Sequence, residues 1–324
     1  PLALDALPRG SRQAALRDGL LRDPRGGGGR LGGAAQGLPA PAGDLPDGRA
    51  AGQGLEVIGW KKQGNFSPSL KRLKIDLMRI YEGLEDFLPV PNAVVTSGTF
   101  DGVHLGHQKI IQRIREIARS IHGETVLITF WPHPRLVLYP TEHHLRLLST
   151  FEEKANLLRQ FGIDHLVTIP FTQEFSQMTS EQFIRKVLVE KIHTKKLVIG
   201  YDHRFGKNRE GSFDYLQEHS SEFGFELEEI SRQDVEEIGV SSTKIRKALD
   251  SGDIRTATNY LGRPYELNGL VVKGQQIGRS IGFPTANIHI PNDYKLIPHD
   301  GVYAVEVKVE GVLYKAMLNI GNRP

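Results

Sequence analysis

The stretch AVVTSGTFDGVHLGHQKI at residues 93–110 joins a short apolar run to a loop that contains glycines and two histidines. The run at 93–96 is typical of a buried strand. Behind the loop, a helix is expected at about residues 107–120. Its apolar stripe has helical spacing and consists of Ile110, Ile111, Ile114 and Ile117.

The alternation of strand and helix patterns continues as far as residue 200. Further strands are expected at 125–130, 164–169 and 196–200, and further helices at 150–161 and 180–192. Strands that alternate with helices of this length predict an α/β fold with a doubly wound parallel sheet. Because ligands on such sheets bind outside the carboxyl ends of the strands, the loop after residue 96 is a candidate site.

The loop has the composition of a phosphate site. Glycines let its backbone approach a ligand, and the helix behind it offers free N–H groups and a positive dipole end. His104 and His107 add two imidazoles three residues apart, which favours a polyphosphate ligand. The alternative is that both are surface histidines around a tight turn. Zinc is disfavoured, because no cysteine or nearby carboxylate cluster completes the usual set of about four ligands.

Three more strings follow the loop in order. They are TFWPHP at 129–134, GYDHRFG at 200–206 and VSSTKIR at 240–246. With GTFDGVHLGHQKI at 98–110, which contains the His-x-Gly-His pattern of the nucleotidylyltransferase superfamily, they closely resemble the adenylyltransferase module of bacterial bifunctional riboflavin kinase/FAD synthetases. The resemblance covers residues 78–324. It implies a Rossmann-like nucleotidylyltransferase domain with a parallel sheet, followed by an all-β riboflavin kinase barrel.

The resemblance also implies a reaction and its residues. FMN phosphate would attack the α-phosphorus of ATP, giving FAD and pyrophosphate, with Mg²⁺ bridging phosphate oxygens and no general base required. The implied catalytic residues are His104, His107, Ser242, Thr243 and Arg246. The implied ATP-binding residues are these five together with Gly98, Thr99, Phe100, Asp101, Gly102 and Gly200. The implied FMN-binding residues are His133 and Asp202.

Each of the later strings has a plainer interpretation. Residues 241–243 precede a helical run and could form only an N-cap, although a capped helix N-terminus is itself an anion site. Asp202 could lie in a mobile surface turn. Members of the family often carry Phe where this chain has His203, so the contact made by that residue is left open. His133, between two prolines, could simply end its strand.

A second unit is expected from about residue 263, where strands at 265–273 and 303–309 are separated by Gly and Pro loops. The string GRSIGFPTAN at 278–287 resembles the riboflavin kinase signature. The resemblance implies that Gly278 and Gly282 flank ATP phosphates and that Thr285 and Asn287 supply Mg²⁺ ligands. A Gly/Pro loop between two strands is the alternative. Because the catalytic Glu of the family lies beyond position 324, we expect this barrel to be incomplete and its kinase activity to be absent.

The first residues have a different composition. Residues 1–54 hold 13 of the 35 glycines and contain no Lys, Ile, Phe, Tyr, Thr, Asn or His. The string MRIYEGLEDF at 78–87 reads like a translation start. We therefore predict a disordered or artefactual extension at 1–77, an FMN adenylyltransferase domain at 78–262 and a truncated riboflavin kinase barrel at 263–324.

Composition excludes several classes of protein. The chain has 324 residues, 39% of them hydrophobic and 24% charged, and no apolar run approaches the roughly 18 residues of a membrane span. With no cysteine it has no disulfide framework, which fits a cytoplasmic protein. Seven Arg and five Asp in residues 1–54 account for two of the three net positive charges, so nucleic acid is not an expected partner.

Three functions remain open. The first is FAD synthesis, with ATP, FMN and riboflavin as small-molecule substrates and the oligomeric state unknown. The second is nucleotidyl transfer to another substrate, which the string at 278–287 argues against. The third is a non-catalytic flavin or nucleotide-binding module, which the combination of His104, His107, Ser242, Thr243 and Arg246 disfavours, because a pure binder does not need groups that stabilise a transition state.

Overall fold

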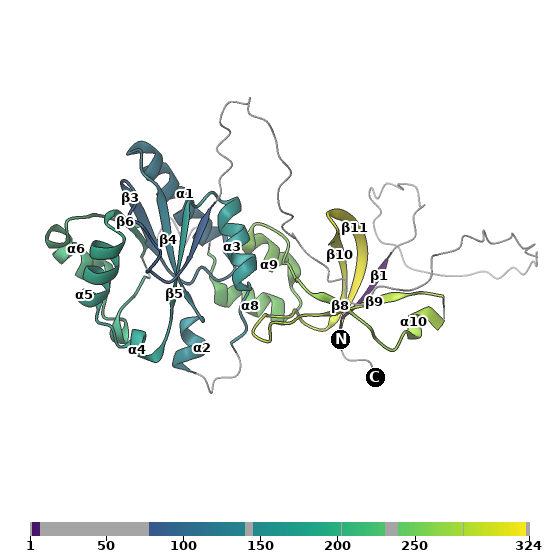
Figure 1. The fold of residues 1–324 in the computed structure, drawn as a ribbon. Coiled ribbons are helices and arrows are strands. Elements are labelled where there is room, and N and C mark those ends of the chain that lie inside the picture. Colours follow the sequence, from purple (N-terminus) through teal and green to yellow (C-terminus); the bar gives the residue numbers. More distant parts are fainter. Residues whose placement is uncertain are drawn as a thin grey trace, which may run out of the picture.

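The computed structural model describes residues 2–6, 78–139, 145–201, 203–230, 239–280 and 282–321. Among these residues it contains a parallel sheet with helices on both faces, a helical segment, and an antiparallel sheet formed mainly by the C-terminal residues (Figure 1). The predicted α/β fold class, followed by a β unit, is confirmed.

The parallel sheet has the strand order β2-β5-β4-β3-β6-β7, and every neighbouring pair runs parallel. The chain moves from β3 to β4 and β5 on one side of β3 and then returns to β6 and β7 on the other. β3 is therefore the topological switch point, where doubly wound sheets bind ligands. The strands are β2 (Arg79–Glu82), β3 (Ala93–Ser97), β4 (Thr125–Trp131), β5 (His165–Pro170), β6 (Thr194–Gly200) and β7 (Glu226–Ile230).

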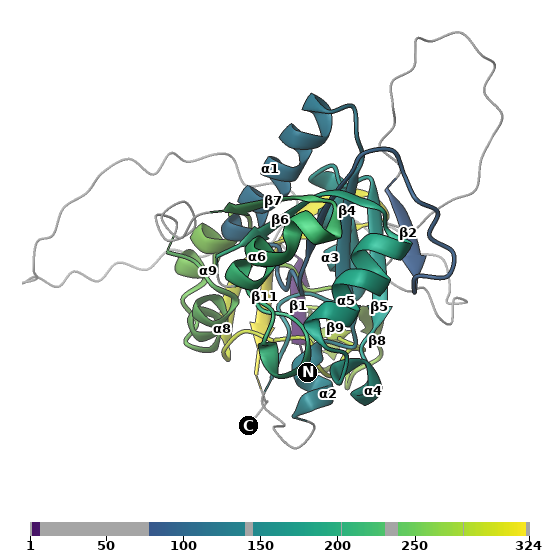
Figure 2. The same ribbon diagram turned by 90° about the vertical axis from the view of Figure 1, so that its left-hand side faces the viewer.

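Helices cover both faces of this sheet. They lie on either side of the strands in Figure 1, and Figure 2 looks onto the face covered by α5 and α6. α1 (Leu105–Ser120) and α3 (Phe151–Gln160) bury their apolar stripes against the face that carries Val94. Val95 points to the other face and packs against the other helices. These are α5 (Ser180–Phe183), its π-helical continuation η1 (Ile184–Lys191) and α6 (Phe213–Phe223).

A third apolar cluster joins the two units. It forms where α8 (Ser242–Asp250) and α9 (Ile254–Leu261) pack against Leu148 and Leu296. Leu148 precedes α3 of the parallel unit, whereas Leu296 belongs to the C-terminal unit. Short helices α2 (Pro134–Leu138) and α4 (Gln173–Ser176) and the 3₁₀ turn η2 (Lys207–Arg209) complete the parallel unit.

The antiparallel sheet has the order β10-β11-β1-β9-β8. Its C-terminal strands are β8 (Leu270–Val272), β9 (Thr285–His289), β10 (Gly301–Val309) and β11 (Val312–Ile320), and α10 (Ile277–Ser280) lies between β8 and β9. The strand expected at 265–273 is shorter in the structure, because Tyr265 packs on the α8–α9 cluster and its hydroxyl donates to the carbonyl of Leu296 at 2.8 Å.

The N-terminal segment differs from expectation over five residues. The structure places β1 (Leu2–Ala6) between β9 and β11, antiparallel to both, whereas the sequence predicted disorder there. β1 is held by backbone hydrogen bonds to a strand on each side, and such bonds require no large side chains. The composition of the segment therefore does not reveal this strand. Residues 7–77 lie outside the described residues, and the three proposed domain boundaries stay predictions.

The described residues contain no helix with the length and apolar character needed to span a membrane.

Candidate active site

The turn between β3 and α1 has a backbone that its sequence makes possible. Gly102 has φ +78°, and a Cβ at this position would lie 2.8 Å from the side chain of Leu148, so the turn requires glycine here. Phe100 and Val103 adopt φ values of 47° and 38°, which are strained for side chains of their size. Strain of this kind is typical of ligand sites.

The two histidines of the turn stack on each other. Their ring centroids are 3.7 Å apart at an interplanar angle of 15°, and the ring of Phe100 lies 4.8 Å from that of His107. His104 is the N-cap of α1, and its Nδ1 accepts a hydrogen bond from the backbone N–H of His107 at 3.4 Å. A neutral His104 therefore carries its proton on Nε2. The Nδ1 of His107 is buried and has no hydrogen-bond partner among the described residues.

Burial keeps this histidine pair neutral at pH 7. It lowers the pKa of His104 to about 4, although the nearby Asp101 acts in the opposite direction. Burial also lowers the pKa of His107 well below its ordinary value, and His104 and Lys154 lower it further. The two rings can therefore each donate one N–H to a phosphate oxygen without being charged beforehand.

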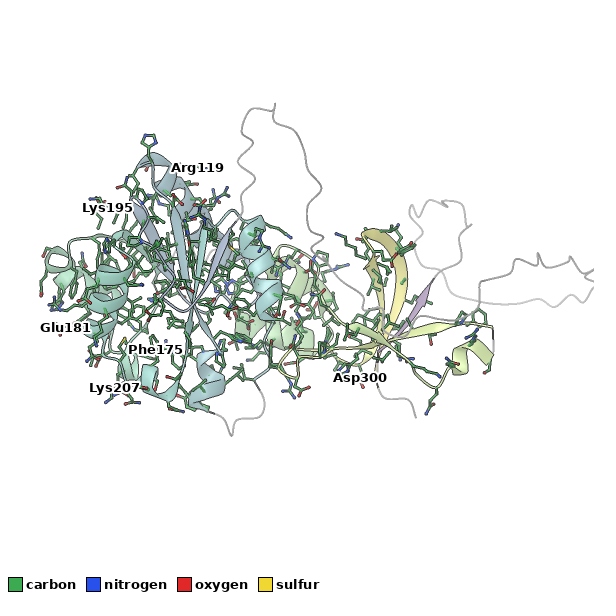
Figure 3. All side chains as sticks on the ribbon, viewed as in Figure 1. Arg119, Phe175, Glu181, Lys195, Lys207 and Asp300 are labelled. Atoms are coloured by element: carbon green, nitrogen blue, oxygen red, sulfur yellow. The ribbon has the colours of Figure 1, made fainter. Side chains whose placement is uncertain are left out.

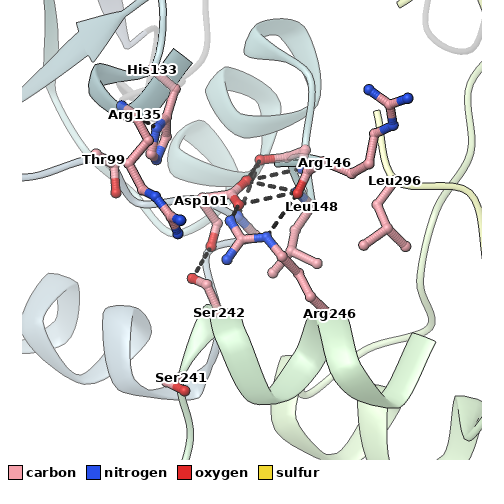
Figure 4. A network of polar contacts seen from close by, with 12 residues as sticks. Thr99, Asp101, His133, Arg135, Arg146, Leu148, Ser241, Ser242, Arg246 and Leu296 are labelled. Atoms are coloured by element: carbon pink, nitrogen blue, oxygen red, sulfur yellow. Dashed lines mark hydrogen bonds and ion pairs between the residues drawn. The ribbon is translucent and has the colours of Figure 1, made fainter. Parts of the chain in front are cut away.

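Asp101 connects the turn to the helical segment (Figure 4). Its carboxylate accepts hydrogen bonds from the backbone N–H groups of Leu148, at 2.9 and 3.1 Å, and of Ser149, at 3.1 Å. The same carboxylate forms an ion pair with Arg246 on α8. The resemblance implied that Asp101 binds ATP, and this stays a prediction. In the structure its carboxylate fixes the position of Arg246.

The N-terminus of α8 faces the same turn. Ser241 is the N-cap and accepts from the backbone N–H of Lys244 at 3.3 Å, as the plainer interpretation of this string predicted. The hydroxyl of Ser242 donates to the backbone carbonyl of Asp101 at 3.1 Å, and Thr243 is exposed. The cap uses Ser241 alone, so it does not conflict with the predicted roles of Ser242 and Thr243.

His133 and His203 follow the ends of β4 and β6, the strands on either side of β3. His133 is the N-cap of α2, and its Nδ1 accepts from the backbone N–H of Arg135 at 3.2 Å. The Nε2 of His203 lies 3.2 Å from the hydroxyl of Ser97 at the end of β3. Burial lowers the pKa of each to about 4. Gly200 ends β6 beside His203, whereas Asp202 lies outside the described residues.

The lowered pKa values predict how stability depends on pH. His104, His133 and His203 have pKa values of about 4 in the folded protein, against 6.5 ordinarily. The unfolded chain therefore binds more protons between these values, and stability is expected to fall as pH drops from about 6.5 towards 4. Each tenfold loss of proton affinity in a ring corresponds to at most about 1.4 kcal/mol, before screening by solvent.

Urea unfolding midpoints at pH 7, 6 and 5 test this expectation. A midpoint that stays constant or rises over this range would contradict it. The variant His203→Phe removes one of the three imidazoles, so its unfolding midpoint is expected to decrease less between pH 7 and pH 5.

Lys154, which lies on α3, was not among the site residues predicted from the sequence. Its side chain is 4% exposed, and its ammonium donates to the carbonyl of Thr99 at 3.2 Å and to the hydroxyl of Thr129 at 2.9 Å. Thr99 belongs to the turn, and Thr129 lies on β4. A signal was present, because Lys154 falls among the apolar positions of the helix predicted at 150–161.

The C-terminal unit also contacts the site. Lys295 is buried, forms an ion pair with Glu153 and donates to the carbonyl of Leu148 at 2.8 Å. The backbone of Leu147 pairs with Tyr294 and Leu296 on either side of Lys295, at 2.6 and 2.8 Å. The segment at 147–149 that binds Asp101 is thus held by the second unit.

The residues implied in kinase chemistry gather around β9. Thr285 and Asn287 share one face of this strand, because they are two residues apart. A Cβ at Gly278 would lie 3.2 Å from the Thr285 side chain, and one at Gly274 would lie 2.1 Å from that of Asn287. Gly282 has φ +81° in the same loop. The described part of the chain has no cluster of three or more His, Asp or Glu that could hold a metal.

Two helix N-termini therefore meet at the switch point of a parallel sheet, with neutral donors and an anchored arginine between them. This arrangement defines a nucleotide-binding domain of the nucleotidyltransferase type, joined here to an antiparallel β unit. A family model described as FAD synthetase matches residues 89–244, and one described as riboflavin kinase matches residues 261–324. The chain belongs to the bifunctional riboflavin kinase/FMN adenylyltransferase family.

Known proteins match this chain over most of its length. A bifunctional riboflavin kinase/FMN adenylyltransferase of Listeria monocytogenes is 38% identical over 230 residues, which are 71% of this chain and 72% of that protein. Its Escherichia coli K12 counterpart is 36% identical over 250 residues, 76% of this chain and 79% of that protein. A crystal structure described as a macrolide-efflux protein from Streptococcus pneumoniae has a TM-score of 0.67 at 28% identity, covering 76% of this chain and 79% of that one.

Proposed function

We propose that this chain transfers the adenylyl group of ATP to FMN, forming FAD and pyrophosphate. A phosphate oxygen of FMN attacks the α-phosphorus of ATP, and the bond from that phosphorus to the bridging oxygen of the pyrophosphate breaks. The observation that supports this reaction best is the Nδ1 of His107 in the first turn of α1, which is buried and has no hydrogen-bond partner in the described part of the chain. An unsatisfied buried polar atom at a helix N-terminus is what a phosphate ligand would complete.

The protein positions charge in this mechanism and forms no covalent intermediate. His104 and His107 donate N–H groups to phosphate oxygens of ATP, and Arg246 supplies a fixed guanidinium. Ser242 and Thr243 add hydroxyls and the free N–H groups of α8. The backbone around the turn approaches the nucleotide at Gly98, Thr99, Phe100, Asp101, Gly102 and, from the end of β6, Gly200.

The acceptor side of the site is assigned to His133 and Asp202, which would bind FMN. His133 lies within electrostatic range of Asp101, Arg246 and Lys154, since all three affect its pKa. A neutral imidazole at this position can donate to the FMN phosphate without competing with Arg246 for it.

Magnesium would enter the first site on the phosphates of ATP, where it would neutralise their charge. The donors around the turn are mainly N–H groups, which suit phosphate oxygens better than a hard cation. In the second unit, Thr285 and Asn287 fit Mg²⁺, because both carry oxygen atoms on one face of β9 next to glycines at 274 and 278. By the same resemblance, that unit would phosphorylate riboflavin with ATP in the full-length protein, and the absence of this activity in the given chain stays a prediction.

The test is an assay with ATP and Mg²⁺ and either FMN or riboflavin, in which FAD and FMN are separated by chromatography. We expect FAD and an equal amount of pyrophosphate from FMN. Binding of ATP without turnover would favour the non-catalytic alternative, and turnover only with another phosphate-bearing acceptor would favour a different nucleotidyltransferase. The riboflavin arm tests the second unit separately. We expect no FMN from riboflavin, and its formation would contradict the expected absence of kinase activity.

A further inference from the structure

The described residues contain two deeply buried lysines with different surroundings. Lys295, 3% exposed, has the carboxylate of Glu153 at 2.5 Å. Lys154, 4% exposed, contacts only neutral oxygens, those of Thr99 and Thr129, and no described carboxylate lies within 4.0 Å of its ammonium. Burial of a charge without a counter-charge is unfavourable, so such a group is retained where it has a use.

Lys154 carries its charge at neutral pH. Burial lowers the pKa of Lys154 to about 8, and the more distant Asp101 limits this decrease. The rings of Trp131 and Phe151 lie 5.9 Å from the ammonium, at the outer limit of a cation–π contact. The aromatic contacts are thus too long to replace a counter-ion.

The position of this ammonium relates it to phosphate chemistry. It contacts the turn at Thr99 and lies close enough to His107 and His133 to lower the pKa of each. These two residues are the ones assigned to ATP phosphates and to the FMN phosphate. A phosphate group of a bound substrate could therefore serve as the counter-ion of the Lys154 ammonium, which lies near both His107 and His133.

We propose that Lys154 is a further residue of the adenylyl-transfer site, whose buried ammonium is neutralised by a phosphate group of a bound substrate. This inference rests on the proposed function, since the phosphate belongs either to ATP or to FMN. The competing explanation is that Lys154 only ties the turn to β4 through its two hydrogen bonds.

Three substitutions at this position separate charge from hydrogen bonding. Lys154→Gln keeps an amide N–H₂ that can donate to Thr99 and Thr129 but removes the charge. Lys154→Arg keeps the charge, and Lys154→Met removes both the charge and the donors. The matched control is Lys195→Met, because Lys195 is exposed at the amino end of β6, at the same end of the sheet as Arg119 (Figure 3).

Steady-state kinetics with ATP and FMN varied separately, together with melting temperatures, form the test. We expect Lys154→Gln to raise KM for one of the two substrates, or to lower kcat, by about 10- to 100-fold, which corresponds to the loss of a charge-assisted contact. The substrate whose KM rises is the source of the phosphate. Lys154→Arg is expected to recover most of this loss, and Lys154→Met is expected to melt at or above the wild-type temperature.

Wild-type kcat and KM values in Lys154→Gln would overturn the proposal. So would equal losses of activity in all three variants accompanied by lower melting temperatures, because that pattern belongs to a structural tie. If the wild type and Lys195→Met form no FAD, the proposed function fails. Calorimetric titration with ATP and with FMN then tests the role of Lys154 independently of catalysis. An unchanged affinity of Lys154→Gln for both ligands would refute the proposal that Lys154 binds a substrate phosphate.

Discussion

His104→Asn is expected to lower kcat for FAD formation by about 10²- to 10³-fold while the melting temperature stays close to that of the wild type. The reason is that His104 has two functions on opposite ring atoms. Its Nδ1 caps α1 by accepting from the N–H of His107, and its Nε2–H is left for a ligand. Asparagine is among the best N-cap residues, so the cap survives, whereas the distal donor is lost. Removal of one donor from a transition-state oxyanion has an effect of this size.

The comparison with His104→Ala makes this prediction specific. Alanine removes both the cap and the donor, so its stability is expected to fall by about 0.5–2 kcal/mol in addition to the loss of rate. The measurement is kcat at saturating ATP and FMN, with urea unfolding for each variant. Full activity in His104→Asn would contradict the assignment of Nε2–H to phosphate. Equal losses of stability in the two variants would contradict the capping role.

The fold class was predictable because apolar strands and amphipathic helices alternate clearly between residues 93 and 200. The two edge strands escaped prediction. β7 has the sequence ELEEI and β2 has the sequence RIYE, and neither is a continuous apolar run. A strand buried on both faces has a strong apolar signal, whereas an edge strand is stabilised largely by the neighbour it pairs with.

One helix was predicted in the right place, but the sequence did not reveal its hydrogen-bonding pattern. Residues 180–192 form a helical segment, but it changes to π-helical hydrogen bonding over Ile184–Lys191. Its buried residues include Ile184, Val187 and Leu188, whose spacing also fits an α-helix, so the apolar pattern does not separate the two.

The site was predictable where a single string carries it and was not where distant segments meet. The stacked histidines lie three residues apart in one turn. By contrast, Asp101 meets backbone groups 47 and 48 positions away and an arginine 145 positions away. Nothing in a single sequence reveals such partners. The resemblance indicated which residues gather, and the structure adds that Asp101 is a support for Arg246.

Lys295→Met is expected to destabilise the protein by about 3–5 kcal/mol, since it leaves Glu153 buried without its cation. Glu153 is 6% exposed and retains only neutral donors in this variant, Asn268 at 2.7 Å and the N–H of Thr150 at 3.0 Å. Urea or thermal unfolding followed by circular dichroism provides the measurement. The loss is expected to exceed that of Lys196→Met, which removes a lysine from a more exposed pair with Glu228.

The double variant Lys295→Met with Glu153→Gln separates charge from packing. It removes both charges but keeps the amide oxygen and N–H₂ of glutamine beside Asn268 and Thr150, so most of the lost stability is expected to return. The hydrogen bond from Lys295 to the carbonyl of Leu148 does not return in this variant. Since Leu148 binds Asp101, and Asp101 holds Arg246, KM for ATP should remain raised in a double variant that is otherwise stable. A double variant with the wild-type KM for ATP would show that the C-terminal unit stabilises the site without positioning it. A double variant as unstable as Lys295→Met would show that the loss of stability comes from packing and not from charge.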